Sequence, residues 1–380
     1  MNRIILIGNG FDLAHGLKTS YKDFIDDYFV KIKNNIKVEP TDRYDYKGEK
    51  RYIRYSFENE SISFLQETEY SFRLDDIIRG AQYKNKFLET VTKKFGLKNW
   101  VDIEEEYYFA LKSIINNKDV IFKWSKYSFN PPEDKKIKYD SIDELNECFN
   151  QIEIELAKYL KQEYQTEFKE SVIKSKDIYR NLLMIIGSNF KPKDFTTIET
   201  SERFKPRNIL FLNFNYTPTE GLYYGPNAGI NAETIHIHGE LFNDKNPIIF
   251  GYGDELDEHY QQILKNGDNR LLENVKSIKY AETDNYKRML NFINSDEYQV
   301  LIMGHSCGNS DRTLLNTLFE HKNCQSIKIF YYEKTNEKGE KSDNFSDIYR
   351  NITRNFTNFA DLRAKVVDKT NSIPLPQIKS

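Results

Sequence analysis

Glycine, asparagine, histidine, serine and aspartate residues follow several short apolar runs in this sequence, and their types and spacing suit chemistry. The first group follows Ile4 to Ile7 and reads Gly8-Asn9-Gly10-Phe11-Asp12. Apolar residues then recur at helical spacing, at Leu13, Leu17, Tyr21 and Phe24. This pattern predicts a buried strand, a tight glycine turn and a helix, an arrangement whose backbone N–H groups bind phosphate. Position 13 is leucine where the dinucleotide fingerprint has a third glycine, so an ordinary strand-to-helix turn is an equal alternative.

A second group comprises Asn213, Asn215 and Thr217, at the end of the predicted strand Asn208 to Phe214. These residues alternate, so they face one side if the strand continues through them. An amide at such a strand end can hold a ribose hydroxyl or a water. The alternative is that the asparagines cap a turn before Pro218.

Two histidines, His236 and His238, follow the predicted strand Thr234 to Ile237 and point the same way if the strand continues through both. A metal pair needs a third ligand, and the candidates, such as His259 and Asp254, are scattered, so we expect no metal. His238 precedes Gly239, which leaves room for a substrate, and imidazole transfers protons near neutral pH. The alternative is a structural histidine bonded to backbone.

A third glycine turn reads Gly304-His305-Ser306-Cys307-Gly308, after the predicted strand Gln299 to Met303. It matches the nucleophile elbow of serine hydrolases, but that mechanism needs an acid and then a histidine downstream, and only His321 follows. We therefore interpret Ser306 and Asp311 as hydrogen-bonding groups for a ligand. Helix capping is the alternative for Asp311. Similarly, helix-dipole complementarity accounts for the acids in NWVDIEEEY, namely Asp102, Glu104, Glu105 and Glu106. The alternative is that one of these carboxylates projects from an inserted helix into the cleft.

Composition indicates a globular protein without a nucleic-acid groove or a membrane patch. The chain has 380 residues, 39% of them hydrophobic, and Lys+Arg 55 nearly balance Asp+Glu 58. Three scattered cysteines are too few for a disulfide framework or a four-thiolate zinc site. With no apolar leader segment, the sequence predicts a cytoplasmic protein.

The order of patterns predicts an α/β fold with a doubly wound, mostly parallel sheet and a large helical insertion. Residues 1–27 and 205–380 are expected to form the α/β core, and residues 28–204 the mostly helical insertion of one domain. Further strands are predicted at Pro247 to Phe250 and Ser326 to Tyr332, and later helices at Leu256 to Leu264, Tyr280 to Ile293 and Ile348 to Phe359. Within the insertion, loops are predicted at Val38 to Tyr55 and Tyr127 to Tyr139, and helices at Ile62 to Glu67, Leu74 to Ile78, Phe87 to Phe95, Ile103 to Ile115, Ile142 to Tyr164 and Ser171 to Ile186. Ligands bind such sheets beyond the carboxyl ends of the strands, where the polar groups above lie.

Taken together, the segments resemble the AbiH family of bacterial abortive-infection proteins. The resemblance rests on ILIGNGFDLAHGLKTSYKDF, WVDIEEEY, FLNFNYTPTE, IHIHGEL with IIFGYGDE, and IMGHSCGNSD, in this order. AbiH proteins in turn look like distant relatives of sirtuin-type, Rossmann-like NAD-binding folds. In that comparison Gly8-Asn9-Gly10 corresponds to the pyrophosphate loop, Asn215 to the asparagine near the nicotinamide ribose, His238 to the catalytic histidine, and Gly304 to Ser306 to the late glycine-serine turn.

Because a four-cysteine zinc module is absent, the resemblance implies a defence-type NAD hydrolase rather than a protein deacylase. On this hypothesis Asn215 positions ribose or water, His238 is the general base, and the N–H groups of Asn9 to Asp12 hold the pyrophosphate. Asp12 or Asp311 would bond ribose hydroxyls, and Thr217, Gly239, Gly304 and Ser306 would complete the nucleotide site. NAD would be the substrate, and a closed insertion, a homo-oligomer or a partner would restrain the enzyme. The expected partners are a second copy of the chain or a phage-derived trigger. The alternatives are a sensor that binds NAD or ADP-ribose without turnover and, third, a serine hydrolase using Ser306.

Overall fold

The computed structural model describes residues 1–71, 73–95, 102–116, 120–122, 135–174, 176–196, 204–226 and 228–378. Contacts divide the chain into two compact units. Residues 1–19 with 160–380 form the first, called here the sheet unit, and residues 20–159 form the second unit. The helix α6 (Ile142–Lys174) contributes residues to both. The interpretation of residues 28–204 as an insertion within one domain stays a prediction.

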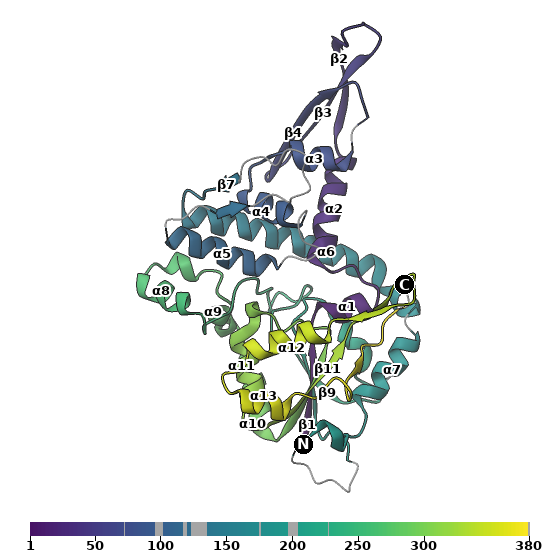
Figure 1. Ribbon diagram of the computed structural model, residues 1–380, viewed down its shortest axis with the longest axis vertical. Helices are drawn as coiled ribbons and strands as arrows, with labels where there is room; N and C mark the ends of the chain where they lie inside the picture. The colour runs from purple at the N-terminus through teal and green to yellow at the C-terminus, as the bar shows by residue number, and fades with distance from the viewer. Residues whose placement is uncertain are drawn as a thin grey trace. The chain divides into compact units, whose positions relative to one another are not determined.

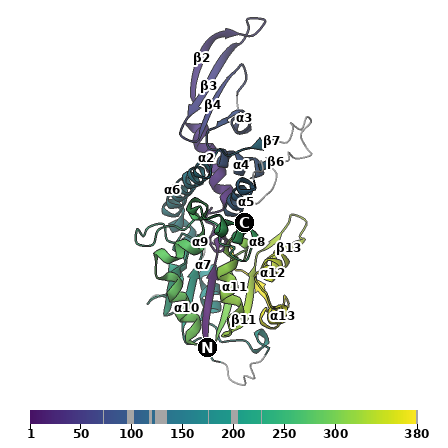
Figure 2. The ribbon, with the colours of Figure 1, turned by 90° about the vertical axis from the view of Figure 1, so that its left-hand side faces the viewer.

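Within the described ranges, the sheet unit is built on a six-stranded sheet in which each neighbouring pair of strands is parallel. The order across the sheet is β9-β8-β1-β10-β11-β14, and β1 runs upward from the N-terminus in Figure 2. The strands are β1 (Asn2–Ile7), β8 (Ile209–Asn213), β9 (Ala232–His236), β10 (Tyr298–Met303), β11 (Cys324–Tyr331) and β14 (Ile373–Pro374). The chain adds strands on one side of β1 and then on the other, so its direction of winding reverses between β1 and β10. The predicted α/β class is confirmed.

Burial on both faces explains why the strands read as continuous apolar runs. All of β1 is buried. Ile4 and Leu6 contribute to one hydrophobic core, whereas Ile5 and Ile7 contribute to the other. Successive side chains of a strand point to opposite faces, so a single strand supplies both cores.

Helices cover the two faces of the sheet (Figure 1). One core includes residues of α10 (Asn285–Ser295), α11 (Arg312–Glu320), α12 (Phe345–Arg354) and α13 (Phe359–Lys365). The other includes residues of α1 (Asn9–Ala14) and α7 (Lys176–Ile186). This two-sided cover is the arrangement expected of a parallel sheet.

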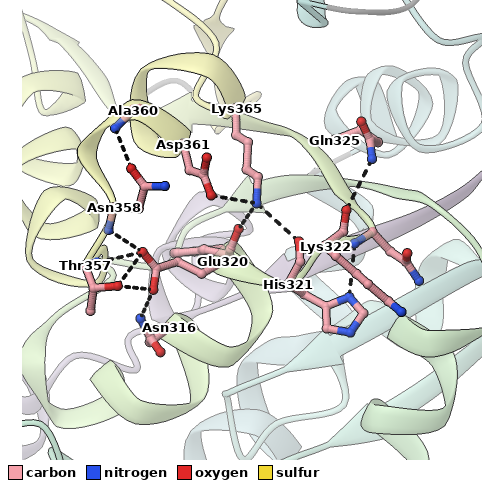
Figure 3. Close-up of polar contacts among 12 residues, drawn as sticks. Asn316, Glu320, His321, Lys322, Gln325, Thr357, Asn358, Ala360, Asp361 and Lys365 are labelled. Carbon is pink, nitrogen blue, oxygen red and sulfur yellow. Dashed lines mark hydrogen bonds and ion pairs between the residues drawn. The ribbon is translucent and has the colours of Figure 1, made fainter.

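The end of α11 is fastened by hydrogen bonds to the segment around α13 (Figure 3). The Glu320 carboxylate accepts from the backbone N–H groups of Thr357 and Asn358, at 2.6 and 2.7 Å. The Lys365 ammonium donates to the carbonyls of Phe319 and His321, at 3.1 and 3.2 Å. A cation at a helix C-terminus complements the helix dipole, and a carboxylate complements a helix N-terminus. These contacts therefore stabilise the C-terminus of α11 and the N-terminus of α13.

Shorter elements complete the sheet unit. They are η1 (Pro192–Asp194), η2 (Thr219–Tyr223), α8 (Glu258–Asn266), η3 (Asn269–Leu272), α9 (Lys276–Lys279), η4 (Tyr280–Glu282), η5 (Asn309–Asp311), and the antiparallel pair β12 (Glu333–Thr335) and β13 (Lys341–Asp343).

Three details of the core differ from the sequence prediction. Pro247 to Phe250 form no strand; Ile249 is buried in a core, and its N–H donates to the His238 carbonyl at 2.8 Å. The predicted helix Ile348 to Phe359 is two helices, because Asn358 caps the second by accepting from Ala360 N. The two-residue strand β14 is too short to leave a period in the sequence.

The second unit combines helices with a small antiparallel sheet. Its elements are α2 (Tyr21–Asn34), β2 (Lys37–Tyr44), β3 (Arg51–Glu58), β4 (Ile62–Thr68), α3 (Leu74–Gly80), β5 (Gln82–Tyr83), α4 (Lys86–Phe95), α5 (Ile103–Ile115), β6 (Val120–Phe122), β7 (Lys135–Ile137) and the first part of α6. The predicted helices over Leu74 to Ile78, Phe87 to Phe95, Ile103 to Ile115 and Ile142 to Tyr164 are confirmed, and Phe87, Tyr107 and Phe149 pack together between them.

Two predictions for this unit are wrong. The predicted loop Val38 to Tyr55 contains the paired strands β2 and β3, whose charged side chains are mostly exposed while the backbone groups bond to each other. The predicted helix Ile62 to Glu67 is strand β4. Burial of Ile62 and Phe64 follows the strand period of two, and the run is too short for the pattern to decide. Most of the predicted loop Tyr127 to Tyr139 lies outside the described residues.

Candidate functional site

The predicted site residues of the sheet unit lie at the carboxyl ends of β1, β8, β9 and β10. These strands are neighbours in the order β9-β8-β1-β10, and the winding reverses between β1 and β10. Helices leave opposite faces of a sheet at such a reversal, which is why ligands of open α/β sheets bind there. Two clusters of buried polar side chains occupy this edge.

The glycine turns after β1 and β10 pack against each other through their backbones. Gly10 N donates to Gly304 O at 2.8 Å, and a Cβ on Gly8 would stand 2.5 Å from the Cα of His305. Phe11 N donates to Gly8 O at 2.8 Å. Close packing of two turns therefore accounts for these glycines, and two of the N–H groups assigned to a pyrophosphate donate within the protein.

The first cluster, called the Asp12 cluster, comprises Asp12, Asn213, Asn215, Thr217, Glu220 and His236. Asn213 Oδ1 accepts from Asn215 N at 2.7 Å, and its amide donates to Thr217 O at 3.1 Å. Asn213 thus caps the turn, as the structural alternative predicted. Asn215 instead reaches across to the first turn, where its Nδ2 donates to Gly8 O at 3.1 Å.

Asp12 is the buried acid of this cluster, with 1% of its surface exposed. Thr217 Oγ1 donates to Asp12 Oδ2, whereas Asp12 Oδ1 has no hydrogen-bond partner among the described residues. Burial raises the pKa of Asp12 to about 7, with a smaller contribution from the charge of Glu220 and against the hydrogen bond from Thr217. Asp12 can therefore gain or lose a proton near neutral pH.

Glu220 and His236 form a buried pair that the sequence analysis missed. His236 Nε2 donates to Glu220 Oε1 at 2.8 Å, and Asn213 Nδ2 donates to Glu220 Oε2 at 2.6 Å. Burial alone would lower the pKa of His236, but the hydrogen bond and charge of Glu220 raise it overall. The available signal was Glu220 itself, an acid shortly after the Asn215 turn in TPTEGL.

The second cluster, called the His238 cluster, comprises His238, Lys276, Tyr280, His305 and Asp311. Asp311 Oδ1 lies 2.8 Å from Lys276 Nζ and 3.3 Å from His238 Nε2, and Asp311 Oδ2 lies 3.4 Å from His305 Nε2. Lys276 is fully buried. The Asp311 side chain does not cap α11, which answers the capping alternative.

Electrostatics fixes the charges in the His238 cluster. Burial lowers the pKa of His238 to about 4, and the Lys276 ammonium adds to this effect, so the imidazole is neutral at pH 7. Burial would raise the pKa of Asp311, but Lys276 and the hydrogen bonds from His238 and His305 hold it well below its ordinary value. His238 Nε2 also lies 3.1 Å from Tyr280 Oη.

The two histidines of the sequence IHIHG belong to different clusters. The sequence predicts that they point the same way only if the strand continues through both. This condition is not met, because β9 ends at His236 and the chain turns through Ile237 into Gly239, whose φ is 83°. Phe214 packs against the rings of His238 and His305.

The other predicted residues surround these clusters. Asn9 Oδ1 accepts from Thr19 Oγ1 at 2.5 Å, and Phe11 packs on His15 and Tyr223. A Cβ on Gly239 would stand 2.0 Å from Pro247 O, so backbone packing requires this glycine. Ser306 is exposed, and the non-glycine residue with a positive φ in its turn is Cys307, at 55°. A nucleophile elbow places the serine itself at the strained position.

The remaining predictions concern the acidic start of α5 and potential metal ligands. Asp102 caps α5 by accepting from Glu104 N and Glu105 N, whereas Trp100 lies outside the described residues. No group of three or more potential metal-ligating side chains occurs in the part of the chain that the structure describes.

A cavity of about 300 Å³ lies beside the Glu220 and His236 pair. Its polar walls include Glu220, Thr234, His236, Glu240, Asn285 and Arg288. Asn285 Nδ2 donates to His236 O at 3.0 Å, which holds one wall in place. The arrangement can bring a small polar ligand to the buried Glu220 carboxylate.

Comparison with known proteins identifies the family. Neither the curated proteins nor the solved structures contain a significant match. No helix among the described residues is both long and apolar enough to span a bilayer. The family model described as bacteriophage abortive infection AbiH matches residues 4–333, which include both clusters. The chain therefore belongs to the AbiH family.

Proposed function

We propose that this AbiH protein acts in abortive infection against phage by hydrolysing NAD at its nicotinamide–ribose bond. The family description supports the biological role. In chain order of the core strands, the sheet order is that of a Rossmann-like dinucleotide fold, which supports a nucleotide at the reversal between β1 and β10. A distant sirtuin-like relationship remains part of this proposal.

The single observation that carries the chemistry is the buried Glu220 and His236 pair beside a polar cavity at the carboxyl edge of the sheet. Ligand sites are typically concave, with volumes of roughly 300–1,000 Å³ and a few convergent polar groups. This cavity lies at the lower limit, which suits the ribosyl end of a nucleotide. Cleavage proceeds through an oxocarbenium-like centre, and the negative charge of Glu220 would stabilise it.

The reaction balances with one water and no added redox group. The C1′–N bond breaks and its electron pair leaves with nicotinamide, while a water oxygen bonds to C1′. The water's proton passes to Glu220. His236 is a positioning residue in this scheme, because both ring nitrogens already face acceptors, at 2.8 Å to Glu220 Oε1 and 3.3 Å to Asn215 O.

This assignment moves the base from His238 to Glu220. His238 is buried and faces Asp311 and Tyr280, whereas Glu220 lines the cavity. Asn215 supports the site by joining the turns after β1 and β8. Restraint by an oligomer and activation by a phage-derived trigger belong to the same proposal, since an unrestrained NAD hydrolase would harm its own cell.

The test is to measure cellular NAD and released nicotinamide during phage challenge, with and without the protein. We expect Glu220→Gln to lower hydrolysis by about 10²-fold or more, as for loss of a general base. Glu240→Gln is the matched control, because Glu240 lines the same cavity. His238→Ala and Asn215→Ala test the assignment made from the sequence, in which His238 is the base and Asn215 positions ribose or water. That assignment requires both variants to abolish turnover.

Unchanged NAD with intact phage protection would contradict the proposal. Calorimetric binding of NAD or ADP-ribose without product would favour the sensor alternative. Labelling of Ser306 by a fluorophosphonate would favour the serine hydrolase.

A further inference from the structure

A second cavity, of about 400 Å³, lies in the sheet unit away from the site above. It is lined by residues of α7 and of the strands β1, β10, β11 and β14. Its walls join charged and apolar groups, among them Arg3, Met184, Asp194, Leu301 and Lys328. The cavity is therefore built for a ligand with both kinds of surface, or it holds a charge cluster that serves the fold alone.

The acid of this cavity bonds directly to one cation, Lys328. Lys328 Nζ lies 2.8 and 3.0 Å from the two Asp194 carboxylate oxygens. The Gln299 amide donates to Asp194 Oδ2 at 3.3 Å. Lys328 and Asp194 are 3% and 7% exposed, so they form a closed buried pair that balances its own charge.

Arg3 is the cation held mainly by neutral groups. Its Nη1 donates to Ile186 O and Ser188 O, both at 2.8 Å, so it caps the end of α7. Those carbonyls carry only about half a unit of negative charge. Its Nη2 donates to Gln299 Oε1 at 3.2 Å, and the guanidinium carbon lies 4.7 Å from the centre of the Phe190 ring. Arg3 is 2% exposed, and its Nε has no hydrogen-bond partner within the described ranges. Burial lowers the pKa of Arg3 to about 10, against the smaller opposing effect of the Asp194 charge, and this leaves Arg3 charged at pH 7.

A third cation, Lys191, lines the rim of the cavity. Two lysines and one arginine therefore line it with a single aspartate, and the excess charge is positive. A buried cation is costly unless an anion compensates it. Capping of α7 explains the position of Arg3 but neither the open volume beside it nor the unpaired Nε.

We propose that this cavity binds a small organic anion, with its carboxylate or phosphate group beside Arg3 and its apolar body against Met184 and Leu301. The volume falls in the range of small-molecule sites. The proposal is independent of NAD hydrolysis, because the two cavities share no lining residue and anion binding is measured without a nucleotide.

Calorimetric titration of the full chain tests this with three probes that share one apolar body: octanoate, octyl phosphate and 1-octanol. We expect one site for an octyl anion, and at least about tenfold weaker binding of 1-octanol, since charge attraction in a partly buried site is worth this much. Comparing octanoate with octyl phosphate identifies the head group. Equal affinity of 1-octanol, or no binding of either anion, would overturn the proposal.

Variants at the rim locate the site without disturbing the buried pair. Met184 is 65% exposed, so Met184→Glu leaves the core intact and should weaken anion binding by about fivefold or more through charge repulsion. Met184→Gln is the neutral control, with affinity within about twofold. Leu264→Glu, at a residue of α8 that is 44% exposed, places the same charge elsewhere and should have no effect. An identical response to Met184→Glu and Leu264→Glu would contradict the site.

Discussion

Gly304 lies directly against the backbone of Phe11, so that a Cβ added to Gly304 would stand 2.1 Å from the Phe11 nitrogen. The two residues belong to turns that are almost three hundred positions apart in the sequence and follow adjacent strands. The contact fixes the separation of the turns after β1 and β10, and with it the distance between the Asp12 and His238 clusters.

We predict that Gly304→Ala lowers the free energy of unfolding by more than about 2 kcal/mol, because both the clash and the left-handed backbone, with φ of 80°, oppose the new side chain. Gly339→Ala is the matched control. Its φ is 79°, but nothing lies within 4 Å of the added carbon, so it should cost only about 1–2 kcal/mol. Urea unfolding of both variants measures the difference, and equal losses would show that the packing of the turns is loose.

Asp12→Asn should change how stability depends on pH. The pKa of Asp12 rises from 3.8 to about 7 on folding, so the folded chain binds more protons than the unfolded chain between these values. Stability from this group is complete below pH 3.8 and is lost as the pH rises through 7. The full loss is about 4 kcal/mol at most. We therefore expect the free energy of unfolding of Asp12→Asn, relative to that of the wild type, to be higher at pH 8 than at pH 5. The same difference between the two proteins at both pH values would contradict the raised pKa of Asp12.

Lys276→Met should raise the pKa of His238 and destabilise the fold by about 3–5 kcal/mol, because it leaves Asp311 without its closest cation. Lys328→Met breaks a similar buried pair with Asp194 and should cost a comparable amount, but it should leave the His238 pKa unchanged. NMR titration of the imidazole resonances distinguishes the two variants. A changed pKa of His238 in both variants would mean that the His238 cluster is coupled through the sheet to the pair of Lys328 and Asp194.

The three cysteines should react slowly with a thiol reagent in the folded protein. Cys148, Cys307 and Cys324 are all buried, and burial raises the pKa of each thiol, that of Cys324 to about 12. The reactive thiolate is therefore scarce as well as inaccessible. Labelling with a chromogenic disulfide should reach completion only in denaturant, whereas a cysteine introduced at the exposed Ser342 should react at once. Rapid labelling of the native chain would contradict this burial.

The sheet could be predicted because its strands are buried on both faces, so that most of them appear in the sequence as apolar runs. The sequence did not predict β14, β2 or β3, and the reasons differ. The first is two residues long, and the others are held by backbone pairing between polar segments. Neither situation produces a hydrophobic period.

At the candidate site, position along the chain predicted which residues gather at the carboxyl edge but not how they pair. Asn215 and His238 follow neighbouring strands, yet the end of β9 at His236 sends the histidines into separate clusters. Glu220 and Lys276 lie in short helices between loops. Such segments are too short to show a hydrophobic period, so the sequence does not predict where their side chains lie. The roles of the predicted catalytic and nucleotide-binding residues stay predictions until the variants above are measured.

The position of β1 has a consequence for synthesis of the protein in the cell. Of the six strands of this sheet, β1 is synthesised first, and its two partners are Ile209–Asn213 and Tyr298–Met303. Until translation passes residue 303, one edge of β1 has no strand beside it and the turn carrying Gly304 does not exist. A nascent chain at that stage has every residue of the Asp12 cluster but lacks His305 and Asp311, so the His238 cluster is the later of the two to be completed.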